Sequence, residues 1–244
     1  MLVVCNGMVR SGSTLQYNIV RMVLEHTTGV SVDGFYELKD VLGNKEKFLI
    51  KQKEKHTTLI KMHEVYPFVS QNKSSEIKLL YIYRDIRDVA VSLKEKLNID
   101  GDRLIEMLDD AIEQSNIIHN SPVILSQRYE NLFTDLKGGI HEIASFLEVE
   151  LSGEQVLKIE KECSIEKVKI NVDRLSKKRM INFGKRLANR LGVRTGRYHK
   201  KTLYHHNHIS KNEGSIGVWR TNLTELEKDI INERYCDWIA LKKY

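Results

Sequence analysis

The first 24 residues constrain the fold of this chain more than any other stretch. The consecutive apolar residues Leu2–Cys5 predict a buried strand, and the glycine-containing segment Gly7–Thr14 follows as a turn. Residues 15–24 then place apolar side chains at the spacing of one helix face. A strand, a glycine loop and a helix in this order align backbone N–H groups at the helix start, where an anion can bind. The stretch therefore predicts an α/β fold with an anion-binding loop, or with an ordinary turn, at this place.

The turn has the glycine spacing of a nucleotide-hydrolase phosphate loop without its lysine. Gly7 and Gly12 match the pattern G-x-x-x-x-G-K-[ST], but Ser13 occupies the lysine position. The cation of the loop is Arg10, two residues before the second glycine. Such a loop is suited to phosphate oxygens through its N–H and hydroxyl groups, and it is poorly equipped to hold Mg·ATP. The hydroxyl groups belong to Ser11, Ser13 and Thr14.

Strands alternate with helices along the rest of the chain. Further strands are predicted over 30–32, 57–63, 78–83 and 122–126, the last opened by Pro122. Helices are predicted over 85–97, 102–118, 132–147 with a break at Gly138–Gly139, 153–163, 176–191 and 224–242. The alternation predicts a central, mostly parallel sheet flanked by helices on both faces. We expect one domain over residues 1–244.

Four side chains with functional chemistry come at or just after the carboxyl ends of predicted strands. They are Arg10, His63, Arg84 and Tyr129. Ligands of open parallel sheets bind at the carboxyl ends of the strands. We therefore expect one crevice to collect these four side chains.

Composition indicates a globular protein that we expect in the cytoplasm. Hydrophobic residues make up 41% of the 244 residues, and no apolar run is as long as a membrane span. The first residues lack the basic region and the long apolar run of a signal peptide. The three cysteines, Cys5, Cys163 and Cys236, are widely spaced, which indicates reduced thiols rather than a disulfide framework. No cysteine and histidine spacing typical of a metal site occurs, and we expect no metal and no membrane partner.

Positive charge is concentrated in one segment. The net charge is +6, and the eleven Arg and Lys residues from Arg174 to Lys201, among which no acidic residue stands, leave −5 for the rest of the chain. This argues against a surface that coats nucleic acid and for a local anionic partner. The segment can be a solvated helix, a flap at about 174–204, or a surface for an acidic acceptor or a nucleic acid. We expect a helix combined with a flap.

The most specific string in the chain is YRDIRDVAVS at 83–92. Arg84 ends a predicted strand, and Ser92 follows about two turns into the next helix. Together with Arg10–Thr14 and a late G-x-x-G-x-W-R pattern from Gly214, this string resembles the sulfotransferases that use PAPS (3′-phosphoadenosine 5′-phosphosulfate). The motifs occur in the family's order over nearly the whole chain. The resemblance implies a P-loop-like three-layer sandwich, PAPS as donor co-substrate and PAP (adenosine 3′,5′-bisphosphate) as product.

The resemblance assigns the groups of PAPS to separate residues. Arg10 would contact the bridging oxygen of the phosphosulfate. Better-known members carry lysine at this position, so a planar guanidinium group replaces a compact ammonium group. Arg84 and Ser92 would hold the 3′-phosphate, and Tyr129 would contact the adenine, with a core aromatic as the alternative. The expected donor-binding residues are Arg10, Ser11, Gly12, Ser13, Thr14, Arg84, Ser92, Tyr129, Lys211, Asn212 and Gly214.

Two positions depart from the family pattern. Leu15 stands where the family often has tryptophan near the adenine. Asn212–Glu213 stand before Gly214, where the family has Arg-Lys. Lys211, Arg220 or a cation from the basic segment would supply the missing charge.

The resemblance also covers the acceptor chemistry. Leu59–His63 ends in the family's Lys-x-His, in which the histidine is the general base, and a near-neutral pKa suits that role. The implied reaction is in-line displacement at sulfur, with Arg10 and Lys61 stabilising the charge on the leaving oxygen. The expected catalytic residues are His63, Arg10 and Lys61. His205 or His208, beyond the basic segment, is an alternative base.

Two other classes of function stay open beside sulfonate transfer. A phosphate-loop kinase or hydrolase would use the same loop, but the lysine after Gly12 and a strand-end aspartate for Mg²⁺ are missing. A non-catalytic PAP-binding or nucleic-acid-binding protein would use the basic segment. We expect sulfonate transfer to a hydroxyl or amine of a small-molecule acceptor. We expect that acceptor to be polar because only 7% of residues are aromatic.

Overall fold

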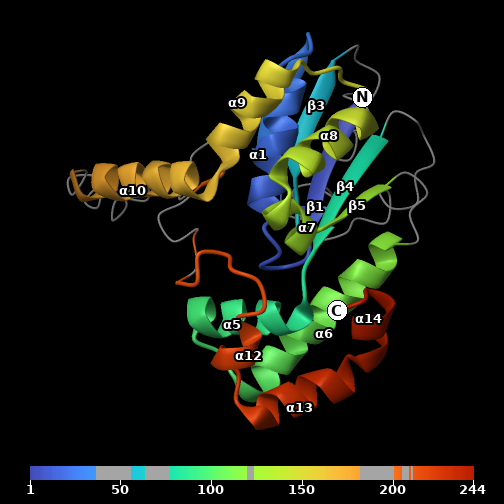
Figure 1. Cartoon of the computed structure of the whole chain (residues 1–244), viewed down its shortest axis with the longest axis vertical. Helices are drawn as coiled ribbons and strands as arrows, with labels where there is room; N and C mark the ends of the chain where they lie inside the picture. Colours follow the sequence, from blue (N-terminus) through green and yellow to red (C-terminus); the bar gives the residue numbers. More distant parts are fainter. Residues whose placement is uncertain (37–55, 64–76, 120–123, 182–200, 205–208, 210) are drawn as a thin grey trace.

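A parallel sheet forms the centre of the molecule (Figure 1). The computed structural model describes residues 1–36, 56–63, 77–119, 124–181, 201–204, 209 and 211–244. The five strands lie in the order β2-β3-β1-β4-β5, and every neighbouring pair is parallel. They are β1 (Leu2–Gly7), β2 (Val30–Phe35), β3 (Thr57–Lys61), β4 (Ile77–Tyr83) and β5 (Ile124–Arg128). The predicted α/β fold is confirmed.

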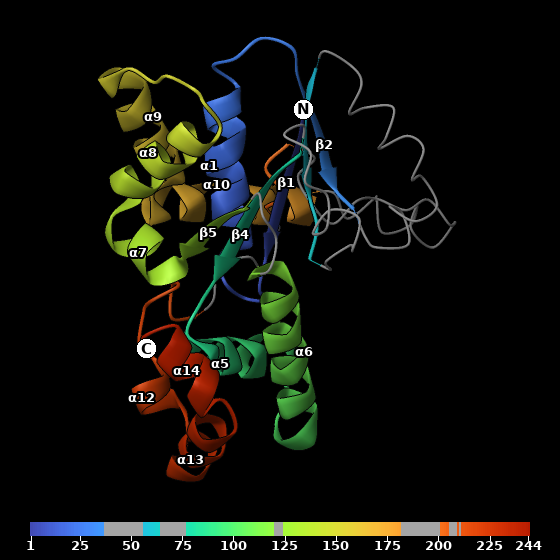
Figure 2. The ribbon, with the colours of Figure 1, turned by 90° about the vertical axis from the view of Figure 1, so that its right-hand side faces the viewer.

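Helices cover the sheet and continue beyond the carboxyl ends of its strands (Figures 1 and 2). Helices α1 (Ser13–Leu24), α8 (Leu136–Phe146) and α9 (Gly153–Cys163) pack together on one face. The others are α5 (Ile86–Leu97), α6 (Gly101–His119), α7 (Tyr129–Thr134), α10 (Ile165–Ile181), α12 (Trp219–Asn222), α13 (Glu225–Arg234) and α14 (Cys236–Leu241). In the part of the chain that the structure describes, no helix combines the length and the apolar character that crossing a membrane requires.

The pleat of β1 divides its side chains between two hydrophobic clusters. Val3 and Cys5 pack with α1, α8 and α9, whereas Leu2 and Val4 belong to the cluster on the opposite face. Successive side chains of a strand point to opposite faces of the sheet. Because both faces are covered, all six residues of β1 are buried. This explains why the strand is a continuous apolar run rather than an alternating one.

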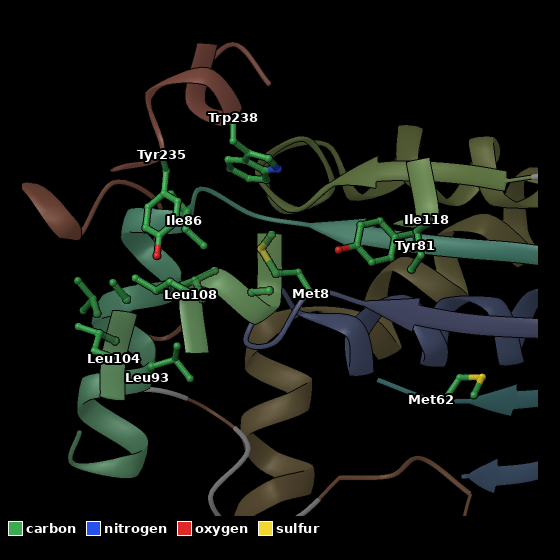
Figure 3. Close-up of a cluster of buried hydrophobic side chains, with 14 of the residues drawn as sticks. Met8, Met62, Tyr81, Ile86, Leu93, Leu104, Leu108, Ile118, Tyr235 and Trp238 are labelled. Carbon is green, nitrogen blue, oxygen red and sulfur yellow. The ribbon is translucent and has the colours of Figure 1, made fainter. Parts of the chain in front are cut away.

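Helix α5 lies at the carboxyl ends of the strands and packs into the hydrophobic cluster that also covers one face of the sheet. Asp85 caps the helix because its carboxylate accepts from the N–H of Arg87 at 3.0 Å. Ile86 and Leu93 are buried in the cluster of Figure 3, with side chains from α6, α13 and α14. Burial of each such side chain stabilises the fold by about 2 kcal/mol. This core holds the helix that carries Ser92.

Three predicted helix boundaries are wrong. The break near 138 comes earlier, at Asp135, because its carboxylate accepts from the N–H of Gly138 and starts a new helix, α8. The predicted helix 224–242 is interrupted at Tyr235, whose hydroxyl donates to Asp109 at 3.0 Å. The helix predicted from residue 176 begins at Ile165 instead. Its predicted continuation to 191, and Pro122, lie outside the described residues.

Candidate active site

The loop between β1 and α1 depends on left-handed backbone at two residues. Arg10 has φ 62° and Gly12 has φ 83°. A Cβ at Gly12 would lie 2.6 Å from a ring carbon of Tyr129, so glycine is required where this ring meets the loop. The carbonyl of Gly12 accepts from the N–H of Leu15 at 2.8 Å, which begins the helix. The glycine thus permits both the turn and the close approach of Tyr129.

Ser11, one of the expected donor-binding residues, turns its side chain into the protein. Its hydroxyl oxygen lies 2.6 Å from the carbonyl oxygen of Met8 and 3.0 Å from that of Ile82. A hydroxyl group has one hydrogen, which these two acceptors share. Ser11 is fully buried and is not part of the cavity lining. Its side chain therefore ties the loop to β4.

Two cations meet hydroxyl groups where β1 and β3 end. The Nε of Arg10 donates to Ser92 Oγ at 2.9 Å, and the Nζ of Lys61 donates to Thr14 Oγ1 at 2.5 Å. Burial, with the positive charge of Arg10, lowers the pKa of Lys61 from 10.5 to about 7. Burial and the nearby Arg84 likewise lower the pKa of Arg10. An anion between these groups would relieve that electrostatic cost.

His63 borders the same cavity two residues after β3. Its ring donates a hydrogen bond to the carbonyl of Gly7, and the ring centroid lies 5.5 Å from that of Phe35. The side chain of His63 is exposed at the cavity. The surrounding protein atoms, followed by the positive charge of Lys61, lower its pKa from 6.5 to about 4. The imidazole is therefore neutral at pH 7. Because one ring nitrogen donates to Gly7, the other is the proton acceptor.

Arg84 follows β4 and reaches a segment far along the chain. Its Nη2 donates to the carbonyl oxygen of Ser215 at 2.7 Å and lies 3.4 Å from Asp88 Oδ2. Its guanidinium carbon lies 4.5 Å from the ring centroid of Tyr129. Its Nε is buried and has no hydrogen-bond partner among the described residues. A buried donor in this condition is a position where a ligand oxygen fits.

Arg87 lies about one helical turn after Arg84. Its described contacts are with neighbouring protein side chains and not with the cavity. Its guanidinium donates to both carboxylate oxygens of Asp85, at 2.9 and 2.8 Å, and lies 4.0 Å from the ring of Trp219. The neighbouring Asp88 accepts from the N–H groups of Gly217 and Trp219 at 2.7 and 3.1 Å. Arg87 and Asp88 therefore form structural pairs around the start of α5.

The segment 209–217 is attached to the cavity wall by side chains from several elements. The hydroxyl of Tyr129 donates to the carbonyl of Gly214 at 2.8 Å. The amide of Asn212 donates to Glu95 at 2.6 Å, so this predicted donor ligand turns toward α5. Lys211 is exposed, and neither it nor Asn212 belongs to the cavity lining. Of the three residues expected here to bind the donor, the structure brings only Gly214 to the cavity.

One cavity of about 550 Å³ collects most of the predicted site. It is lined by the predicted residues Arg10, Gly12, Ser13, Thr14, Lys61, His63, Arg84, Ser92, Tyr129 and Gly214. The expectation that the residues after the predicted strands share one crevice is confirmed. Side chains of α7, α9 and α10 that the sequence did not single out complete the wall, among them Phe133, Glu160, Ile165 and Val168. Helical periodicity indicates which side of such a helix points inward, but it does not indicate whether that side borders a cavity or the hydrophobic core.

Part of the predicted site lies outside the described residues. This applies to the alternative bases His205 and His208 and to most of the basic segment 174–201. Within the ranges that are described, no group of three or more His, Cys, Asp or Glu residues is arranged to hold a metal ion.

The fold and the cavity define a P-loop-like α/β protein with a cation-lined site at its strand ends. Residues 3–241 match the family model described as the sulfotransferase domain, and the chain therefore belongs to this family. The amine sulfotransferase of Oryctolagus cuniculus is 24% identical over 170 residues, which cover 62% of this chain and 51% of that protein. The chain thus spans about half the length of this curated relative.

Solved structures give the same fold. Retinol dehydratase, crystallised with androsterone and the inactive cofactor PAP, has a TM-score of 0.61 at 18% identity, over 98% of this chain and 80% of its own. Mouse sulfotransferase SULT7A1, crystallised with PAP, has a TM-score of 0.63 at 16% identity, over 100% of this chain and 88% of its own. The predicted P-loop-like sandwich is therefore confirmed.

Proposed function

We propose that this chain transfers a sulfonate group from PAPS to a hydroxyl or amine group of a small-molecule acceptor and releases PAP. The observation that carries the proposal is the convergence of Arg10, Lys61, His63 and Arg84, from the ends of three neighbouring strands, on one cavity. Membership of the sulfotransferase domain family supports this activity. The complexes of the structural relatives with PAP support the donor.

The cationic and hydrogen-bond-donating side chains of the cavity suit a molecule that carries anionic groups at two places. Arg10 and Lys61 would hold the phosphosulfate, together with the helix start that follows the loop. Arg84 and Ser92 would hold the 3′-phosphate. The buried Nε of Arg84 supports this assignment because a phosphate oxygen would supply the acceptor that it lacks among the described residues.

Residues of this chain would carry out the transfer as follows. PAPS supplies the sulfonate group, and PAP leaves from the sulfur through its 5′-phosphate oxygen. His63 takes the proton of the acceptor hydroxyl or amine while the acceptor atom bonds to sulfur and the bond from sulfur to the bridging oxygen breaks. The hydrogen bond from the ring to Gly7 leaves the second ring nitrogen as the base. Arg10 and Lys61 would stabilise the negative charge that develops on the bridging oxygen.

The test is sulfonate transfer by the whole chain, with PAP formation followed by mass spectrometry. We expect His63→Asn to lower turnover on the order of a hundredfold or more, because general-base catalysis has about that magnitude. PAP affinity, measured by calorimetry, should stay near that of the wild type. The matched control is His141→Asn, a substitution of an exposed histidine on α8.

Three results would contradict the proposal. The first is that no acceptor in the panel receives a sulfonate group. The second is full turnover by His63→Asn. The third is stabilisation of the fold by ATP with Mg²⁺ but not by PAP. Mass action predicts that a true donor or product raises the melting temperature in proportion to its affinity. A thermal-shift comparison of PAP with ATP therefore separates this proposal from a kinase or hydrolase.

The acceptor panel has to contain both amines and hydroxyl compounds. The rabbit relative is an amine sulfotransferase, and the retinol dehydratase crystal contains androsterone, a hydroxyl compound. The described cavity wall includes Val9 and also Phe35, whose ring centroid lies 5.5 Å from that of His63. A polar acceptor, a single domain with a helix and flap at about 174–204, and a cytoplasmic location stay predictions.

A further inference from the structure

The proposed 3′-phosphate site has lost a cation of its family's pattern. Asn212 and Glu213 stand where Arg-Lys would precede Gly214. In the structure the Asn212 amide donates to Glu95, and the Glu213 carboxylate pairs with Lys169 of α10. Glu213 even places a negative charge on the cavity wall. A donor with a 3′-phosphate therefore needs positive charge from another element.

Lys96 of α5 is placed to provide this charge. It lies four residues after Ser92, so both side chains leave the same face of the helix. Its Nζ donates to the carbonyl oxygen of Ile209 at 2.7 Å, and Ile209 lines the cavity together with Ser92 and Arg10. Burial, then the positive charge of Arg10, lowers the pKa of Lys96, with Lys211 acting in the same direction. The carboxylate of Glu95 acts in the opposite direction. Lys96 is not itself part of the cavity lining, and it adjoins the cavity through its contact with Ile209.

We propose that the Lys96 ammonium group binds the 3′-phosphate of PAPS and PAP and so replaces the cation absent at 212–213. This inference rests on the proposed function. Ser92, Lys96 and Arg84 would then form the phosphate cradle, two of them from consecutive turns of α5. The Ile209 carbonyl oxygen is a neutral acceptor, whereas a phosphate oxygen forms the stronger, charge-assisted hydrogen bond with an ammonium group.

The test compares PAP with AMP, which lacks the 3′-phosphate, by titration calorimetry on the full chain. Lys96→Gln keeps a donor for the Ile209 carbonyl but removes the charge. We expect it to weaken PAP binding about tenfold and to leave AMP binding nearly unchanged, because one charge-assisted hydrogen bond is worth about 1.5–3 kcal/mol. Lys96→Arg should restore PAP binding. The matched control is Lys94→Gln on the same helix, where Lys94 pairs with Glu227 of α13.

A second measurement on the wild type is independent of any variant's folding. Acylation of lysines, read by mass spectrometry, should slow at Lys96 in the presence of PAP but not AMP, and stay unchanged at Lys94. Equal losses of PAP and AMP affinity in Lys96→Gln, or full retention of the preference for PAP, would overturn the inference alone. If the wild type itself shows no preference for PAP over AMP, both this inference and the proposed donor fail.

Discussion

The cavity holds positive charge differently in two clusters of side chains, which meet where Arg10 donates to Ser92. We call Arg10, Lys61 and His63 the strand-end cluster and Arg84, Ser92 and Lys96 the helix-end cluster. In the strand-end cluster the two cations donate to hydroxyl groups, and the charge of Arg10 helps to lower the pKa of Lys61. In the helix-end cluster the two cations donate to backbone carbonyl oxygens of the segment 209–217, and the carboxylates of Asp88 and Glu95 lie nearby.

The difference indicates which property each cluster controls. Buried cations held by neutral hydroxyl groups are costly in the folded protein and are ready to stabilise an anion without rearrangement, which is what electrostatic catalysis requires. Cations already bound to carbonyl oxygens must exchange these acceptors for a ligand. We therefore expect substitutions in the strand-end cluster to change turnover most, and substitutions in the helix-end cluster to change donor affinity most.

Lys61→Met should break the strand-end cluster with the largest effect. We expect turnover to fall on the order of a hundredfold, the usual loss when one preorganised donor is removed. The free variant should nevertheless melt at a higher temperature than the wild type at pH 7. Kinetics with PAPS and calorimetric melting measure the two effects, and unchanged turnover or a lower melting temperature would contradict the assignment.

The same variant tests the pKa of Lys61 through the pH dependence of stability. The folded pKa of about 7 lies below the ordinary 10.5, so the folded protein releases a proton that the unfolded chain keeps. The contribution of Lys61 to stability therefore rises with pH between these two values and is smallest below them. Between pH 7 and about 10, the melting temperature should therefore rise more steeply with pH for the wild type than for Lys61→Met.

Arg84→Met and Arg87→Met compare a cavity arginine with a structural one from the same motif. For Arg84→Met we expect PAP affinity to fall about thirtyfold, because a charged donor to phosphate is lost. For Arg87→Met we expect stability to fall by about 3 kcal/mol, because the buried carboxylate of Asp85 loses its bidentate partner. Calorimetry and denaturant unfolding separate the two. Equal losses of PAP affinity in both variants would show that the contrast is wrong.

PAP binding should change the protonation of His63 itself. Its pKa of about 4 is low because of the surrounding protein atoms and the positive charges of Lys61 and Arg10. Phosphate groups next to these cations would offset their charge, and we expect the pKa of His63 to rise by about one unit or more. NMR titration of the ring protons with and without PAP measures the change, with His63→Asn used to assign the signals of His63. A pKa that stays constant or falls would place the phosphates elsewhere.

The smallest expected effect is that of Glu213→Gln on PAP affinity, and it tests how strongly charge next to the helix-end cluster controls binding. The substitution removes a negative charge from the cavity wall, so we expect PAP to bind about two- to threefold more tightly at low salt, with the gain shrinking as salt rises. Glu225→Gln is the control because Glu225 pairs with Lys228 on α13, away from the cavity. Weaker PAP binding by Glu213→Gln would mean that the pair with Lys169 matters more than its charge.

Local patterns allowed much of this molecule to be predicted. The strand β1, the loop and α1 follow from an apolar run, glycines and helical periodicity, and helix 153–163 is bounded as predicted. The cap of α5 is likewise local, because the Asp85 carboxylate accepts from the N–H of Arg87 only two positions away. The breaks at Asp135 and Tyr235 were missed because glycine and periodicity suggested other boundaries than the cap and the core contact that set them.

By itself the sequence determined the α/β class, the family and the strand-end positions of Arg10, His63 and Arg84, because alternation, motif spacing and parallel topology are written in neighbouring residues. Only the tertiary structure decided that Ser11 faces inward, that Arg84 meets Ser215 and that Lys96 reaches Ile209. These last two contacts join residues 131 and 113 positions apart. The packing of α5 against the returning chain brings them together, and no local pattern encodes that packing.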